Sequence, residues 1–382
     1  MNYNFSAEKI NHKSGDFILT LLIILLAGVG ISALFSASYY YGNYKFGDSD
    51  YFLNRQFVFM LTGSVFAFLV SRIPMAIIVN MIPLLLLGSF LLMLATFVPG
   101  IGREMLGGRR WIVVSGMSFQ PSEFVKLTII LYLASIFGKK QEKIHDFINS
   151  VLPPVVIVLV FTALIIAQND FSTAAFLMII SMTIFYIAGV KYGYFVFIFS
   201  AIIPFGLILL FSKEHRVRRI ISFLDPASDP SNAGYQLLSA QRALSHGGFW
   251  GTGIGLGSQK LGGLPEAHSD FIFAVIGEEA GVLGVTFIIV LFLALAVRGY
   301  SLALKFKDSN LFAYFLSFGL TTSILYQALI NMAVVSGIVP VTGIPLPFFS
   351  HGGSSVVVTF IMCGLLLNIS RNKKILLENS VE

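Results

Sequence analysis

The sequence predicts an all-α, polytopic membrane protein with about ten transmembrane helices and one long extracytoplasmic loop between the seventh and the eighth. Of its 382 residues, 56% are hydrophobic and only 12% are charged, whereas a soluble domain carries about 25% charged residues. Apolar runs long enough to cross a ~30 Å hydrocarbon core recur along the whole chain. We therefore expect a single membrane domain over residues 1–382, not a soluble domain with an anchor.

The expected spans follow from these apolar runs. The first run is longer than the ~7–15 residues of a signal-peptide core, so we interpret it as a retained helix. An even number of spans puts both termini on the same side of the membrane. The predicted spans are 16–38, 56–71, 76–98, 122–138, 149–167, 171–189, 193–211, 271–297, 310–331 and 353–370.

Basic residues assign the two sides. Lys and Arg concentrate in both tails and in alternate short loops, for example at Lys139 and Arg298, and are sparse in the opposite loops. Because cytoplasmic loops carry this excess, residues 1–15 and 371–382 are predicted to be cytoplasmic tails of a multi-pass inner-membrane protein, and 212–270 is predicted to be extracytoplasmic. The net charge of +6 reflects these flanks and gives no reason to expect nucleic-acid binding.

The long loop contains a predicted amphipathic helix that we expect to lie against the membrane face. Ser231 is a candidate N-cap, and Gly247 is a candidate end. Three arginines precede this helix, just beyond the seventh span. The helical apolar residues are Ala233, Leu237, Ala240 and Leu244, and the arginines are Arg216, Arg218 and Arg219.

Cofactor motifs are weak in this chain. The glycine-rich run 251–257 does not have the G-x-G-x-x-G spacing, and no Walker-type lysine motif occurs, so nucleotide binding is not expected. The single cysteine, Cys363, excludes an intramolecular disulfide, and the histidines are scattered without a metal-binding pattern. We expect no firmly bound cofactor, and only a divalent cation held loosely at a pyrophosphate stays open.

Two adjacent arginines, Arg109 and Arg110, precede Trp111 in an outer loop, against the positive-inside bias. The guanidinium group suits bidentate recognition of phosphate, and indole rings collect at the level of the lipid headgroups. Two interpretations remain open. The segment either anchors the protein on anionic lipid or clamps a lipid-linked pyrophosphate, with Trp111 stacking on a sugar.

The fourth span opens with polar residues, Gln120, Ser122, Glu123 and Lys126. Glu123 and Lys126 are three residues apart, so they share a helix face and can pair. Ionisable residues at membrane depth are costly and indicate function by default. The pair is either a structural ion pair or the polar floor of a cavity that also contacts substrate.

The approach to the eighth span contains Glu266, His268 and Asp270. Asp270 places a carboxylate at the membrane boundary and is a candidate catalytic residue; it could also cap the eighth helix, and the two roles are not exclusive. Burial would raise the pKa of Asp270 and nearby arginines would lower it, so the net direction is open. If the helix includes Asp270, Gly277 and Gly281 lie beneath it and let another helix approach closely.

Further polar features lie near the ends of the last three spans. Of Glu278 and Glu279, we expect at least one to face a polar cavity. The last external loop, 337–352, contains three prolines and is too apolar to be solvated, so we expect it to be buried or to line a cavity. The amides near Gly353 and Ser354 suit an anion, and a simple tight turn is the alternative.

These segments together resemble the SEDS family, the RodA, FtsW and SpoVE proteins of bacterial cell-wall synthesis. The resemblance implies a peptidoglycan glycosyltransferase that uses lipid II, with Asp270 as its catalytic residue. Ser269 replaces the more usual Thr, and His351 stands where the family usually has Tyr. The matching segments cover most of the chain in the expected order and are GGRRW, QPSEFVKL, QNDFSTA, FLDPASDPSNAGYQ, LPEAHSDFIFAVIGEE and PVTGIPLPFFSHGGSS.

Within the family, QPSEFVKL and YQLLSAQRAL look more like the division branch, FtsW, and VPVTGIPLPFFS looks closer to the elongation branch, RodA. We prefer septal synthesis in cell division, with an elongation-type polymerase for cell shape as the alternative. The resemblance also implies a partner, a class B penicillin-binding protein that acts as transpeptidase and has one transmembrane helix. Other divisome or elongasome membrane proteins are further expected partners.

Under this hypothesis, the 4-hydroxyl of the acceptor GlcNAc attacks C1 of the donor MurNAc with inversion, and the nascent glycan chain grows outside the membrane. Asp270 would remove the hydroxyl proton. Arg109, Arg110 and Lys126, with the loop arginines, would stabilise the departing undecaprenyl pyrophosphate. Two other classes stay open, a lipid II flippase that uses the same polar residues, and a non-catalytic division scaffold that does not need Asp270.

Overall fold

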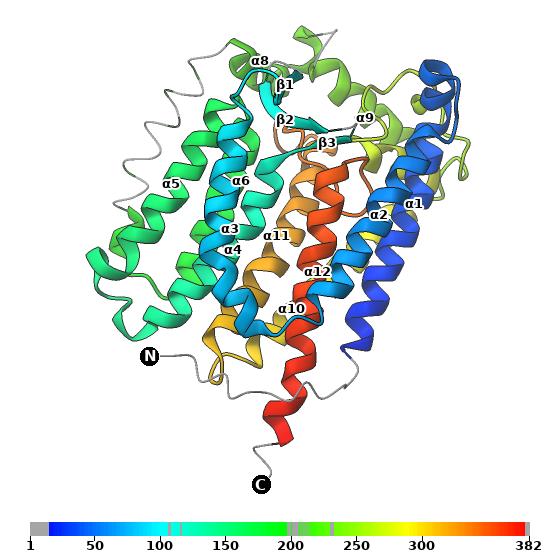
Figure 1. Ribbon diagram of the computed structural model, residues 1–382. Coiled ribbons are helices and arrows are strands. Elements are labelled where there is room, and N and C mark those ends of the chain that lie inside the picture. The colour runs from blue at the N-terminus through cyan, green and yellow to red at the C-terminus, as the bar shows by residue number, and fades with distance from the viewer. Residues whose placement is uncertain are drawn as a thin grey trace.

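The computed structural model describes residues 15–105, 108–114, 117–196, 200, 206, 208, 211, 214–229 and 233–378. Within these residues, eight helices are long and apolar enough to cross a membrane, and a shorter apolar helix accompanies them. The helices form one bundle, and the first helix begins at the same end of the bundle at which the last helix ends (Figure 1). The predicted polytopic all-helical fold is confirmed, and most of the predicted span 193–211 lies outside the described residues.

The bundle helices match the predicted spans closely. The first helix continues beyond the predicted residue 38 through a run of tyrosines, and the last continues into the predicted tail. The bounds are α1 Phe17–Phe46, α2 Tyr51–Val70, α3 Met75–Ala95, α4 Pro121–Lys140, α5 Leu152–Ala167, α6 Phe171–Ile187, α10 Ile272–Leu304, α11 Leu311–Val335 and α12 Gly353–Glu378.

Helix α4 lies at the centre of the bundle. Most of its side chains are buried, including apolar and polar ones alike. Phe137 of α4 packs edge-on against Phe185 of α6 and Phe315 of α11, which ties three helices together. Helices α1, α2 and α3 instead expose many large apolar side chains, as helices that face lipid do. The polar residues at the start of α4 are therefore enclosed by protein.

A small antiparallel sheet lies at the end of the bundle opposite to the end of α12 (Figure 1). Its strands β1 (Gly102–Met105), β2 (Gly108–Val114) and β3 (Met117–Phe119) pair in the order β1-β2-β3. We did not predict these strands. The sheet matters for the site because β2 carries Arg110 and Trp111 and runs directly into α4 through β3.

The loop between the seventh and eighth spans folds into short helices at the same end of the bundle. They are α8 (Glu214–Leu224), η3 (Pro226–Ser228), α9 (Ala233–Gly247) and η4 (Gln259–Leu261). The predicted amphipathic helix is confirmed as α9, and Ser231 lies outside the described residues. The buried face of α9 includes Ala240 and Ala243, and it packs on α10 rather than on lipid.

Helix α10 differs from our expectation at its start, near Asp270, and at Gly281. It begins at Ile272 after Phe271 as N-cap, so Asp270 is neither part of the helix nor its cap. The close approach at Gly277 is confirmed, because a Cβ there would lie 2.3 Å from the Leu244 side chain. At Gly281 the helix is broken, with φ 63° and ψ −162°.

Candidate active site

A cavity of about 820 Å³ opens between the sheet, the loop helices, the segment 341–345 and the ends of α4, α6 and α12. Eight predicted site residues line it. Four others, discussed below, do not. The eight are Arg110, Trp111, Gln120, Glu123, Lys126, Glu266, Asp270 and Ser354.

Asp270 lies on an irregular segment between η4 and α10, with its carboxylate at the cavity wall. The Ser269 hydroxyl donates to its Oδ1 at 3.2 Å. Its backbone oxygen accepts a hydrogen bond from the Asn331 side chain at 2.8 Å. The backbone of Gly343 closes on the carboxylate, since a Cβ at that glycine would lie 3.4 Å from Oδ2. Ser269 therefore holds the carboxylate, Asn331 of α11 holds the backbone of Asp270, and Gly343 lies close beside the carboxylate.

The environment of Asp270 favours the protonated carboxyl more than water does. Burial, reinforced by the nearby Glu266 carboxylate, raises the pKa of Asp270 to about 6, although Ser269, Arg219 and Arg110 act in the opposite direction. The effect of desolvation on the pKa of Asp270 therefore exceeds the opposite effect of the arginines, and this balance could not be decided from the sequence. A carboxylate with a pKa near the working pH is well matched to general acid–base chemistry.

The predicted buried loop at 337–352 contributes residues 341–345, His351 and Gly352 to the cavity wall. Its Phe348 and Phe349 side chains are fully buried. The Ser350 hydroxyl donates to the backbone oxygen of Ser269 at 2.7 Å, and the His351 backbone amide donates to the backbone oxygen of His268 at 2.9 Å. The irregular backbone is thus satisfied within the protein, as an apolar environment requires, and it fixes the segment that carries Asp270.

Arg110 reaches the cavity from β2 and pairs with Asp170 at 3.3 Å. Asp170 also caps α6, because it accepts from the Thr173 amide at 3.1 Å, and it accepts from Gln120 at 3.3 Å. We did not single out Asp170, although an Asp directly before an apolar helix is a common N-cap signal. The pair orients one guanidinium group toward the cavity.

Helix α8 adds two more arginines to the lining, Arg218 and Arg219. Arg218 pairs with Glu214 on the same helix at 2.9 Å. Burial and the nearby Arg110 lower the pKa of Arg219, while Asp170 and Asp270 raise it. Arg110 and Arg219 therefore converge from β2 and α8 on the two aspartates. We placed the loop arginines among the candidates for binding pyrophosphate, and two of them, Arg218 and Arg219, line the cavity.

The predicted pair at the start of α4 is confirmed. The Lys126 ammonium group lies 2.8 Å from the Glu123 carboxylate and 3.2 Å from the Gln327 side-chain oxygen. It also lies over the Phe176 ring, 5.1 Å from the ring centre. Both members of the ion pair are buried and line the cavity, so the two residues form an ion pair that is also part of the cavity wall.

Four predicted site residues lie away from the cavity lining. Arg109 points to the other side of β2, where it is half exposed and pairs with Glu104, because neighbours on a strand face opposite ways. His268 stacks on the Tyr41 ring. Burial beside His351 and Lys45 lowers the pKa of His268 to about 4.

The other two support the cavity from behind. Ser122 is fully buried and accepts from the Gln120 side chain at 3.1 Å. Gly353 begins α12 against the Phe59 ring. Its neighbour Ser354 does line the cavity and accepts from the Gln120 amide at 2.9 Å. The start of α12 is therefore joined to the start of α4.

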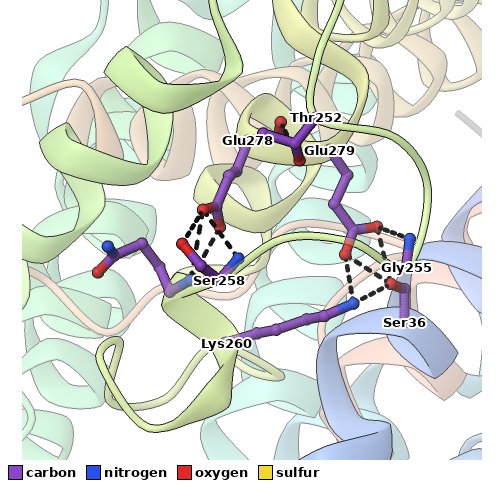
Figure 2. A network of polar contacts seen from close by, with 8 residues as sticks. Ser36, Thr252, Gly255, Ser258, Lys260, Glu278 and Glu279 are labelled. Atoms are coloured by element: carbon purple, nitrogen blue, oxygen red, sulfur yellow. Dashed lines mark hydrogen bonds and ion pairs between the residues drawn. The ribbon is translucent and has the colours of Figure 1, made fainter.

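The expectation for Glu278 and Glu279 is wrong. Neither acid lines the cavity. Both face the loop between α9 and η4 and accept hydrogen bonds from it (Figure 2). Hydropathy shows that these acids lie in an apolar helix, but it does not show which neighbour their side chains meet.

Among the described residues, no group of three or more His, Cys, Asp or Glu side chains is arranged to hold a metal ion. His351 lines the cavity, and burial near Arg55 lowers its pKa to about 4. It is therefore neutral at physiological pH. The cavity combines a poised carboxyl, converging arginines and a buried lysine, which is a suitable arrangement for a pyrophosphate-bearing substrate.

Two known proteins are similar in sequence to nearly the whole of this chain. The probable peptidoglycan glycosyltransferase FtsW of Geobacter sp. (strain M18) is 39% identical over 355 residues, which are 93% of this chain and 96% of that protein. Stage V sporulation protein E of Bacillus subtilis (strain 168) is 36% identical over 358 residues, 94% of this chain and 97% of that protein.

Two solved structures are also similar. A chain of a peptidoglycan synthase complex, described for its coordination of polymerization and crosslinking, has a TM-score of 0.77 at 26% identity and covers 94% of this chain and 98% of its own. A mutant of the rod shape determining protein RodA of Thermus thermophilus has a TM-score of 0.68 at 25% identity, with coverage of 94% and 98%. The family described as cell cycle protein, FtsW/RodA/SpoVE, matches residues 17–375, and this chain belongs to that family.

Proposed function

We propose that this protein is a peptidoglycan glycosyltransferase that polymerises lipid II for septal cell-wall synthesis. The observation that carries the proposal is the cavity, in which Asp270, with its pKa raised to about 6, faces two converging arginines. The relative from Geobacter sp. (strain M18) is named a probable peptidoglycan glycosyltransferase FtsW. The elongation-type role is less well supported, because the relatives with 37–39% identity bear the division name.

The proposed reaction joins two lipid-linked sugars. The acceptor GlcNAc 4-hydroxyl attacks C1 of the donor MurNAc, the bond from C1 to the pyrophosphate oxygen breaks, and a β-1,4 link forms with inversion. Asp270 takes the hydroxyl proton as the new bond forms. General-base assistance of this kind is worth about 10²–10⁴-fold in rate. Ser269 and Asn331 act as positioning residues because they hold the carboxyl and its backbone.

The departing undecaprenyl pyrophosphate needs stabilisation of its negative charge. Arg110 and Arg219 approach Asp270 closely enough to lower its pKa, and Lys126 lines the same cavity. We assign these three to the pyrophosphate. Arg109, which lies outside the lining, has no part in the assignment. A divalent cation at the pyrophosphate would take most of its ligands from phosphate and water, as Mg²⁺ commonly does.

The distribution of Lys and Arg supports a cavity on the outer face of the cytoplasmic membrane, with both termini in the cytoplasm. There the donor must already be activated on lipid, because nucleotide sugars are cytoplasmic. A structural relative belongs to a synthase complex that couples polymerization to crosslinking. We therefore propose a class B penicillin-binding protein as partner, alongside other division membrane proteins.

The test is polymerisation by purified protein. The chain, with its penicillin-binding partner, is given labelled lipid II in detergent, and products are separated by length. We expect glycan strands. Detergent abolishes the two compartments that a flippase needs, so an absence of strands from folded protein would contradict the enzyme and favour a flippase or a scaffold.

A further inference from the structure

Helix α10 is interrupted at Gly281, and a distant loop repairs the interruption. Beyond the break, the Val282 amide donates to the Gly248 carbonyl at 3.0 Å and the Leu283 amide donates to the Phe249 carbonyl at 3.5 Å. A regular helix would direct these amides to carbonyls four residues earlier in α10. The chain after α9 therefore takes the place of a helical turn.

The carbonyls freed by the break are satisfied by the same loop. The Glu278 carbonyl accepts from the Thr252 amide at 2.9 Å, and the Glu279 carbonyl accepts from the Gly253 amide at 3.0 Å. The approach needs a residue without a side chain at Gly251, where a Cβ would lie 2.1 Å from the Glu279 carbonyl oxygen. Loop and helix thus exchange backbone hydrogen bonds in both directions.

The Glu278 carboxylate satisfies the next amides of the loop. It is fully buried. It accepts from the Ser258 amide at 3.0 Å, from the Ser258 hydroxyl at 2.9 Å and from the Gln259 amide at 3.2 Å (Figure 2). All of these donors belong to the loop. The Glu278 carboxylate therefore satisfies hydrogen-bond donors of the loop that would otherwise be buried without partners.

The Glu279 carboxylate ties the loop to α1. It accepts from the Gly255 amide at 3.0 Å and from the Ser36 hydroxyl at 2.7 Å. It also pairs with the Lys260 ammonium group, and all three side chains are buried (Figure 2). The buried charge on this acid is therefore compensated, as a low-dielectric environment requires.

The side chains that the loop turns outward are apolar. Trp250, Ile254 and Leu256 are 78%, 85% and 73% exposed, and Phe249 is also exposed. The run 248–257 contains no charged residue. A large exposed apolar surface of this kind needs an apolar partner, while the amides behind it are largely satisfied by α10.

The position of this loop along the bundle axis indicates what contacts its apolar side chains. Gly281 lies about 14 Å along α10 from its first residue, at 1.5 Å per residue. Val282 and Leu283, bonded to the loop, are themselves exposed apolar residues of the bundle surface. On α1, the exposed tyrosines Tyr39 and Tyr44 lie just beyond the contact at Ser36, where an aromatic belt marks a membrane interface.

We propose that residues 248–256, with Trp250, Ile254 and Leu256 foremost, insert into the lipid leaflet at the cavity side. An irregular segment enters hydrocarbon only where its backbone groups are satisfied by protein. Glu278 and Glu279 supply that satisfaction, which gives these two acids a role outside the cavity. The segment anchors the loop that leads to Asp270 at a fixed depth, and the anchor is independent of the proposed chemistry.

The fluorescence of Trp250 tests this proposal, because the chain has only 2 tryptophans. The Trp111→Phe variant, reconstituted in vesicles, leaves Trp250 as the reporter. Lipids brominated near the carbonyl end of the acyl chain should quench its emission more than lipids brominated near the terminal methyl. Aqueous acrylamide should quench it less in vesicles than in unfolded protein. The matched control is the Trp250→Phe variant, in which the emission comes from Trp111 in the cavity.

A second probe keeps the test available if the tryptophan variant does not fold. The single native cysteine, Cys363, is buried, so Ile254→Cys can be spin-labelled selectively. The label should collide with oxygen more than with a water-soluble nickel chelate. Emission from Trp250 that brominated lipid does not change, or a label at 254 with greater access to the chelate, would overturn the proposal and favour a protein partner or solvent.

Discussion

Two sets of buried acids lie at the same end of this bundle, and they serve different purposes. Glu123 and Asp170 pair with Lys126 and Arg110 at the wall of the cavity, where space remains for a ligand. Glu278 and Glu279 instead receive backbone and side-chain donors of a loop. A buried carboxylate in a membrane protein is thus functional or structural according to its partners, not its depth.

The largest expected effect is a loss of polymerisation activity in a variant of the cavity that leaves stability unchanged. Asp270→Asn should reduce lipid II polymerisation by about 10²–10⁴-fold, because an amide cannot accept the hydroxyl proton. Thermal unfolding in detergent should change little, since the amide keeps the size of the side chain. The initial rate of strand formation is the measurement. A variant that polymerises at the wild-type rate would remove Asp270 from the mechanism.

The loop acids should respond in the opposite way. Glu279→Gln leaves the Lys260 charge buried without its counter-charge, and breaking such a pair costs roughly 3–5 kcal/mol. Equilibrium unfolding in detergent should record the loss. The double variant Glu279→Leu with Lys260→Met should recover part of it, because both charges are then gone. Unchanged stability of the Glu279→Gln variant would mean that the Lys260 charge does not depend on Glu279 for compensation, contrary to the structure.

The two adjacent arginines of β2 offer a matched pair. Arg110→Ala should lower the polymerisation rate by roughly 10²-fold, the usual effect of removing one group that stabilises a developing negative charge. Arg109→Ala should leave the rate unchanged, because its exposed pairing with Glu104 contributes little. An equal loss of polymerisation rate in both variants would contradict the assignment. It would mean that the two arginines act only through the positive charge that they give to β2.

Much of the fold could be predicted because lipid imposes a simple rule on composition. Long apolar runs identified the spans, and a helical repeat identified α9. The three-stranded sheet was missed because its strands are short and pair only with one another. Arg109 was assigned to the site because neighbouring residues in a sequence look equivalent, whereas a strand turns them to opposite faces.

The candidate site was predictable only in part. The start of α4 and the segment with Asp270 carry charge among apolar surroundings, so composition marks both as candidates. The catalytic role of Asp270 was implied by the family resemblance. Asp170 and Arg219 come from segments far apart in the sequence, and only the packing of α6 and α8 brings them together. The role of Glu278 could not be predicted, because its partners belong to a loop about twenty residues earlier.

The central claim is that Asp270 works as a general base from this cavity, and the pH dependence of kcat/KM tests it most directly. His268 and His351 have pKa values of about 4 and stay neutral in the neutral range. Asp270, with a pKa of about 6, must lose its proton to accept another. We predict that kcat/KM is level above about pH 7 and falls about tenfold per pH unit well below pH 6. A profile that stays flat down to about pH 5 would contradict the account.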